Sequence, residues 1–200
     1  MSIYRIHPDR LNFSLLRTIS TKEILDKLGR EYPFHIDPTP KSYEAVWSAL
    51  EVGFYDSSDK GTASELPDIT VGNGKLFLNA RAYEQLHSLL EPHGEFLPVT
   101  YGKNEGYIFN CLSLAEDVAG LDEKLSIKNE YGDLQSLVFH EDKVHSMAIF
   151  RSEFDGYMGF FCKDDFKDAV ESAGLKGITF SIDLGNIFPP DPSAQSPSLH

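Results

Sequence analysis

Two stretches of this 200-residue chain repeat one pattern, in which a strand leads into a helix and the helix into a second strand. In residues 76–101, Asn79 is a suitable helix N-cap, apolar residues follow at helical spacing, and Gly94 ends the helix. Residues 159–182 repeat the order, with a helix that ends at Gly174. Each helix must bury its apolar stripe against a sheet. The two units represent either an internal duplication or a common element that arose twice.

Shorter strands are predicted around these units, at residues 3–6, 107–114, 134–139, 146–151 and 157–162. The last two are expected to pair as a hairpin, and helices are expected at residues 18–30 and around 43–50. The predicted fold class is α+β, a mostly antiparallel β layer with packed helices that contains two strand–helix–strand units.

The predicted organisation has three parts. Residues 1–73 form an N-terminal segment with short helices and an exposed loop at 56–68, packed on the main domain. Residues 74–185 form the α+β domain. Residues 186–200, rich in proline and serine, form a flexible tail.

The composition predicts a folded protein that stays in the cytoplasm. Hydrophobic residues make up 41% of the chain, with 14 Phe and 9 Tyr to build a core. No run approaches the roughly 20 apolar residues of a membrane span, and the N-terminus does not resemble a signal peptide. Cys111 and Cys162 lie in apolar runs, which favours buried thiols over a disulfide.

The charge is strongly acidic, with 31 Asp and Glu against 18 Lys and Arg, a net charge of −13. The imbalance lies almost entirely after residue 50, because residues 1–50 hold seven basic and six acidic side chains. Such a field repels nucleic acid and anionic membranes and attracts basic proteins. The charge therefore favours a basic protein partner, although many cytoplasmic proteins are simply acidic.

Signatures of catalysis and of cofactor or metal binding are missing from the sequence. The glycines in 71–75 precede a strand, whereas a phosphate cradle precedes a helix, so a turn is predicted there. His140, Glu141 and His145 could serve acid–base chemistry or hold a metal, but their position between two strands favours a solvated turn. Trp47 fits either a core residue or an interface anchor. No catalytic residue, cofactor or metal site is predicted.

The best candidate site is the acidic stretch 115–133, which contains only two lysines. Anionic loops of this kind can fill a basic cleft of a partner through charge complementarity, although a solvated loop explains the same composition. The predicted partner-binding residues are Glu116, Asp117, Asp122, Glu123, Glu130 and Asp133.

Seven segments, taken in order, resemble a family of bacterial polymorphic-toxin immunity proteins, a former domain of unknown function named after a myxobacterial immunity protein. The resemblance covers about residues 74–182, and the segments are 76–79, 95–99, 110–112, 120–122, 137–142, 149–151 and 166–180. The last is the most distinctive, because the helix stop Ala173-Gly-Leu-Lys-Gly177 precedes an aromatic strand.

The resemblance implies a protein that binds and neutralises a secreted antibacterial toxin by stoichiometric occlusion in the cytoplasm. The partner would then be the toxin domain of a secreted effector, and no catalytic residue carries over from the family. Two alternatives remain open: an adaptor or chaperone for a secreted effector, and an enzyme that reverses toxin damage.

Overall fold

The computed structural model describes residues 2–17, 19–57 and 65–188. Three α-helices are present in these ranges: α1 (Thr21–Lys27), α2 (Ala80–Leu90) and α3 (Asp164–Ser172). Two 3₁₀ helices are also present, η1 (Glu91–His93) and η2 (Glu116–Val118). The strands are β1 (Ile3–Pro8), β2 (Leu15–Leu16), β3 (Leu50–Glu51), β4 (Phe54–Tyr55), β5 (Ile69–Gly72), β6 (Lys75–Asn79), β7 (Gly94–Tyr101), β8 (Asn104–Cys111), β9 (Ile127–Lys128), β10 (Leu134–Ser136), β11 (Ile149–Phe150), β12 (Phe160–Lys163) and β13 (Ile178–Ser181).

Both predicted strand–helix–strand units are present, and both have a third strand inserted between their two strands. The order of the five-stranded sheet is β3-β7-β8-β6-β5, so β8 separates the strands of the unit β6–α2–β7. The order of the four-stranded sheet is β11-β12-β1-β13, so β1 separates the strands of β12–α3–β13. The inserted strand is antiparallel to both neighbours in each case. The two units thus share a split β-α-β topology.

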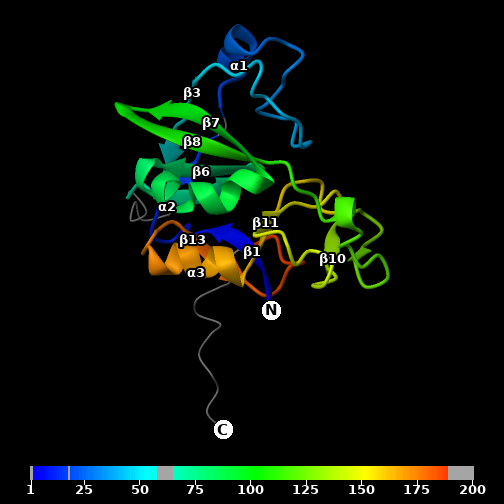
Figure 1. Cartoon of the computed structure of the whole chain (residues 1–200). Helices are drawn as coiled ribbons and strands as arrows, with labels where there is room; N and C mark the ends of the chain where they lie inside the picture. The colour runs from blue at the N-terminus through cyan, green and yellow to red at the C-terminus, as the bar shows by residue number, and fades with distance from the viewer. Residues whose placement is uncertain (1, 18, 58–64, 189–200) are drawn as a thin grey trace.

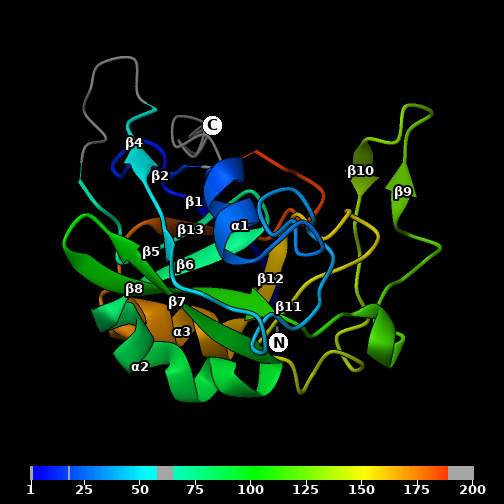
Figure 2. The ribbon, with the colours of Figure 1, turned by 90° about the horizontal axis from the view of Figure 1, so that it is seen from above.

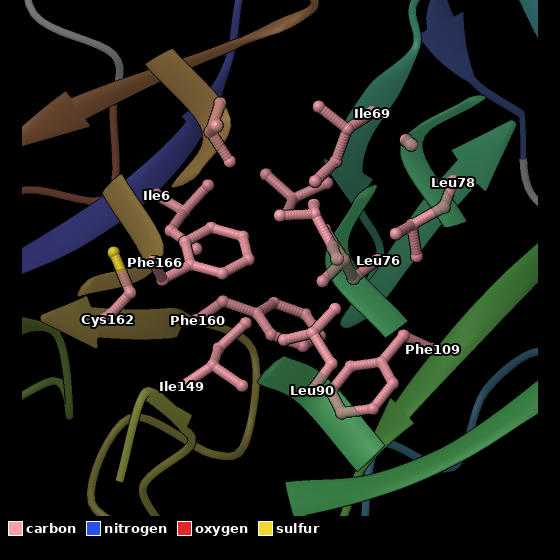
Figure 3. Close-up of a cluster of buried hydrophobic side chains, with 14 of the residues drawn as sticks. Ile6, Ile69, Leu76, Leu78, Leu90, Phe109, Ile149, Phe160, Cys162 and Phe166 are labelled. Atoms are coloured by element: carbon pink, nitrogen blue, oxygen red, sulfur yellow. The ribbon is translucent and has the colours of Figure 1, made fainter. Parts of the chain in front are cut away.

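The two sheets lie one above the other, and α2 and α3 pack with them on a shared core (Figures 1 and 2). Figure 3 shows this core, in which Leu76, Leu78 and Phe109 of the five-stranded sheet approach Ile6 and Phe160 of the other. Alternation along the strands fills two further cores on the outer faces.

Different segments cover the two outer faces. The side chain of Phe77 points to the face of the five-stranded sheet that α1 and residues 32–54 cover. The side chain of Phe161 points to the face of the other sheet that residues 115–154 cover. The inner core therefore belongs to the two units, and each outer core belongs to an added segment.

The local signals at the start of α2 and at the end of α3 are confirmed, whereas α2 ends at Leu90 and Gly94 follows the 3₁₀ helix η1 as the first residue of β7. The Asn79 side chain accepts a hydrogen bond from the backbone N of Ala82 at 2.8 Å, which caps α2. Gly174 follows α3 with φ of +60°, a conformation that favours glycine. The predicted turn at 71–75 is a hairpin between β5 and β6, with positive φ at Asn73 and Gly74.

The predicted helix around residues 43–50 is wrong. Residues 43–46 form a turn and Leu50 begins β3. The carboxylate of Glu95 on β7 accepts hydrogen bonds from the backbone N of Tyr43 at 2.7 Å and of Glu44 at 3.2 Å. Trp47 is half-buried, and its indole N–H donates to the carbonyl of Pro98 at 2.9 Å. Contacts with β7, distant in sequence, therefore override the local helical pattern.

The fold class, α+β with mostly antiparallel sheets, is confirmed. Several elements are shorter than predicted: α1 spans seven residues, β10 spans three and β11 spans two. Strands β11 and β12 form the predicted antiparallel hairpin. Within the described ranges, none of the helices combines the length and apolar character needed to cross a bilayer.

Hydrogen-bonded sheets cross the predicted boundary at residue 73. β1 lies between two strands of the C-terminal unit, and β5 pairs with β6. The division into three parts stays a prediction. Most of the loop at 56–68 and most of the tail at 186–200 lie outside the described residues.

Candidate partner-binding surface

The acidic stretch belongs to a lobe, residues 115–154, that covers the outer face of the four-stranded sheet. Figures 1 and 2 show the yellow-green segment with β10, and in Figure 2 also β9, standing out to one side of the molecule. Its buried side chains pack on β1 and β12 and comprise Ala115, Leu137, Phe139, Val144, Met147 and Phe150. The packing fixes the base of the lobe and leaves the β9–β10 hairpin at its tip.

Backbone hydrogen bonds hold the two sides of the lobe together. The backbone N of His140 donates to Gly120 O at 2.7 Å, and that of Asp122 donates to Val138 O at 2.9 Å. Gly120 permits this close packing, because a Cβ there would lie 2.5 Å from Val144 Cγ1 and 2.9 Å from a backbone oxygen. The acidic stretch is therefore an ordered surface whose carboxylates have defined positions.

Three of the six predicted carboxylates accept hydrogen bonds within the lobe. Glu116 accepts from the Ser152 hydroxyl at 2.6 Å. Asp122 accepts from the backbone N of Lys124 at 3.0 Å and also lies 3.9 Å from the ring of His140. The Asp122 carboxylate thus stabilises a turn, whereas that of Glu116 links η2 to Ser152, which is distant in sequence, so both groups also have a structural role.

The third, Asp133, accepts a hydrogen bond from the Asn129 side chain at 2.9 Å but stays exposed. The other three, Asp117, Glu123 and Glu130, are exposed, and their carboxylates make no hydrogen bond or ion pair with the residues that the structure describes. Their charges are thus available to a partner. The structure brings all six residues into one lobe and divides them into supporting and exposed groups.

Exposed apolar side chains lie among these free carboxylates. Tyr131 is 82% exposed, and Leu125 and Ile127 are about half exposed. Protein interfaces commonly place an exposed aromatic or aliphatic anchor within a polar rim. The β9–β10 hairpin therefore combines both parts of such a surface.

A groove of about 980 Å³ opens at the base of the hairpin. Its lining includes Asp133 and Leu134 of the hairpin, Asp183 and Phe188 of the segment after β13, and Asp155. The segment after β13 packs directly on β10, because a Cβ at Gly185 would lie 3.3 Å from the carbonyl oxygen of Gln135.

A buried ion pair underlies the groove. Arg5 Nη2 lies 3.3 Å from Asp155 Oδ2, and the two side chains are 6% and 3% exposed. Arg5 Nη1 also donates to the carbonyl of Leu184 at 2.9 Å, which holds the segment after β13. Burial raises the pKa of the Asp155 carboxyl, and attraction to Arg5 opposes this rise. Arg5 of β1 thereby positions Asp155 and the segment after β13.

His7, two residues further along β1, is buried as a neutral imidazole. Burial lowers its pKa from 6.5 to about 4; the charge of Arg5 lowers it further, and Asp183 opposes the shift. Between pH 4 and pH 6.5 the unfolded chain therefore binds a proton that the folded chain does not, so stability falls as the pH falls through this window.

We expect the wild-type protein to lose about 3 kcal/mol more stability between pH 7 and pH 4 than a His7→Gln variant, the free energy that corresponds to this shift. Urea unfolding at a series of pH values measures the difference. His140→Gln, at a half-exposed histidine, is the control and should follow the wild-type curve. Parallel curves for wild type and His7→Gln would contradict the buried neutral state.

The other residues that could carry chemistry are buried or make contacts that a structural role explains. Cys111 and Cys162 are free and buried, and burial raises the pKa of the Cys111 thiol to about 12. His145 Nδ1 lies 2.7 Å from the carbonyl of Asp142, within the predicted turn. Across residues 2–17, 19–57 and 65–188, no three or more His, Cys, Asp or Glu side chains are grouped to hold a metal ion. The Asp164 carboxylate, at the first position of α3, accepts from Ser2 N at 3.0 Å.

The C-terminal part of the groove lining is not predicted from the sequence. Ile187 and Phe188 fall in the predicted flexible tail, but both line the groove and are more than half exposed. An apolar pair just before a proline-rich stretch was the available signal. Asp183 carried no such signal, because the pairing of β1 with β13 brings it beside the lobe.

The comparison with curated proteins gave no match for this chain. The comparison with family models did: the matched segment begins within β8, includes the lobe and both strands of the C-terminal unit, and ends just after β13. The first part of the expected resemblance, residues 74–106, lies outside it. The resemblance to an immunity protein family is thus confirmed over one segment: residues 107–182 match the model of the immunity protein family Imm11.

Proposed function

We propose that this chain is an immunity protein that binds the toxin domain of a secreted antibacterial effector and neutralises it in the cytoplasm by stoichiometric occlusion. The observation that carries the proposal is the match of residues 107–182 to the Imm11 immunity protein family. The matched segment contains the whole lobe with its exposed carboxylates. The proposed binding surface is therefore the β9–β10 hairpin and its flanks.

The charge distribution supports a basic surface as the target. Asp117, Glu123 and Glu130 have no compensating partner among the described residues, in a chain of net charge −13. Complementary charges accelerate encounter and fix the orientation of two partners, and salt screens them over about 10 Å at 0.1 M. Tyr131 and its apolar neighbours would supply contact area that does not depend on salt.

The test is protection of cells that express the active toxin domain of the effector encoded beside this chain. We expect the variant Asp117→Asn/Glu123→Gln/Glu130→Gln to protect less, and to bind the purified toxin domain about tenfold more weakly, because about 1.4 kcal/mol of charge complementarity is lost. Calorimetry at two salt concentrations should also show a smaller salt dependence for the variant.

The matched control is Glu84→Gln/Glu91→Gln/Asp168→Asn, which removes three exposed carboxylates from the α2 and α3 side of the molecule. It changes the net charge equally and should bind like the wild type. Equal weakening in both variants would show that only the overall charge matters. No loss in the first variant would remove the hairpin from the binding surface.

The same assay separates the two alternative functions. An adaptor or chaperone for the effector need not protect cells from the isolated toxin domain. An enzyme that reverses toxin damage would protect without forming a complex and at less than one molecule per toxin. Inhibition of the purified toxin that is complete at one equivalent supports occlusion.

A further inference from the structure

The groove beneath the β9–β10 hairpin has a chemistry that the exposed tip does not. Two exposed carboxylates, Asp133 and Asp183, line it. The two cations that line it are already engaged: Arg5 pairs with Asp155, and the Lys128 ammonium lies 4.9 Å from the centre of the Phe154 ring. Three carboxylates therefore line the groove against these two cations, and the groove keeps an excess of negative charge.

A buried acceptor independently indicates a missing donor. Asp155 lines the groove with a side chain only 3% exposed. Its Oδ2 faces Arg5 and accepts from the backbone N of Gly159 at 2.8 Å, whereas its Oδ1 is buried without a hydrogen-bond partner among the described residues. A buried carboxylate oxygen without a donor is costly, and an N–H group entering the groove would satisfy it.

The apolar residues of the groove favour one kind of cation. Met158 and Phe188 are 50% and 64% exposed, and both line it. A guanidinium is planar, stacks on aromatic and apolar surfaces and forms paired hydrogen bonds with carboxylates, whereas an ammonium is a compact, strongly hydrated charge. Carboxylates that line the groove, with an exposed aromatic ring beside them, fit a guanidinium better than an ammonium.

We propose that this groove binds an arginine side chain of the toxin, held between Asp133 and Asp183 above the Arg5–Asp155 pair. The inference rests on the proposed function and specifies part of its interface. The hairpin tip would supply charge for encounter, and the groove would supply a fixed anchoring contact.

The first experiment uses the full chain and a small probe. N-acetyl-arginine amide is titrated into the ¹⁵N-labelled protein, with N-acetyl-citrulline amide as the uncharged probe of the same shape. Arginine amide should shift the backbone signals of residues that line the groove, such as Gly156 and Gly185, and citrulline amide should not. Asp183→Asn should weaken arginine binding about tenfold, the loss expected for one charge-assisted hydrogen bond. Equal shifts with both probes, or none with either, would overturn the proposal.

The second experiment uses the toxin domain and keeps the two proposals separable. Asp133→Asn/Asp183→Asn should slow neither folding nor encounter greatly, but should increase the dissociation rate of the complex about tenfold or more. Glu84→Gln/Asp168→Asn is the control of equal charge change. If the wild type protects cells and the groove variant dissociates at the wild-type rate, the arginine site is wrong and the proposed function stands. If the wild type neither binds nor protects, the proposed function fails by itself.

Discussion

Replacing Arg5 by methionine is expected to lower the free energy of unfolding by about 3–5 kcal/mol, because it leaves the carboxylate of Asp155 buried without its counter-ion. Arg5 is 5% exposed, and its guanidinium also donates to the carbonyl of Leu184. Gly159 lets the backbone approach this pair closely, since a Cβ there would collide with both side chains. The site therefore has little room to relax on the Gly159 side. Denaturant unfolding followed by circular dichroism measures the loss.

Two further variants isolate the cause. Arg5→Met/Asp155→Leu should recover most of the lost stability, because it removes the unpaired charge together with its partner. Arg81→Met removes an ion pair with Asp68 whose arginine is 53% exposed, and should cost about 1 kcal/mol or less. A double variant as unstable as Arg5→Met would show that the loss comes from packing of the arginine stem instead.

Replacing Phe160 by alanine is expected to cost about 3–5 kcal/mol, the usual range for a buried aromatic residue cut back to a methyl group. Phe160 is 1% exposed and extends from β12 into the core between the two sheets, where Figure 3 shows it near Ile149 and Phe166. The Arg151 guanidinium lies 5.5 Å from the centre of its ring. Truncation leaves a cavity at the contact between the two layers.

Phe188→Ala is the matched control, because Phe188 is 64% exposed and its removal should change stability by no more than about 0.5 kcal/mol. Thermal and urea unfolding of the two variants give the comparison. A small loss in Phe160→Ala would mean that neighbouring side chains fill the space, and that the two sheets are less firmly packed than the contacts indicate.

The fold class and both repeated units were predictable from the sequence because their signals are local. Asn79 caps α2 through its own side chain, Gly174 ends α3 through its backbone conformation, and the apolar stripe between such signals has helical spacing. The split topology was not predictable. It depends on the insertion of β8 between β6 and β7 and of β1 between β12 and β13, and β1 lies far from both of its partners in the sequence. Hydrophobic periodicity carries no information on such pairing.

The candidate surface divides in the same way. Composition locates the acidic stretch, but it cannot distinguish Glu116, which accepts from Ser152, from Glu123, which has no such contact. The groove carboxylates Asp155 and Asp183 come from outside that stretch, and the pairing of β1 with β12 and β13 brings them together. The acidic composition therefore defines a candidate region, and the tertiary structure separates its hydrogen-bonded carboxylates from its exposed ones.

The position of β1 has a consequence for how the chain reaches its native state. During synthesis, residues 3–8 leave the ribosome long before their partners at 160–163 and 178–181, so the strand has no sheet to join while the five-stranded sheet can already assemble. A strand whose backbone groups are still unpaired can pair wrongly with other chains. The segment that matches the family model lacks a strand of this sheet in turn: residues 107–182 contain β12 and β13 but not β1, which lies between them. On the proposed function, binding of a partner therefore depends on β1, a short strand that lies far from the lobe in the sequence but packs beneath it.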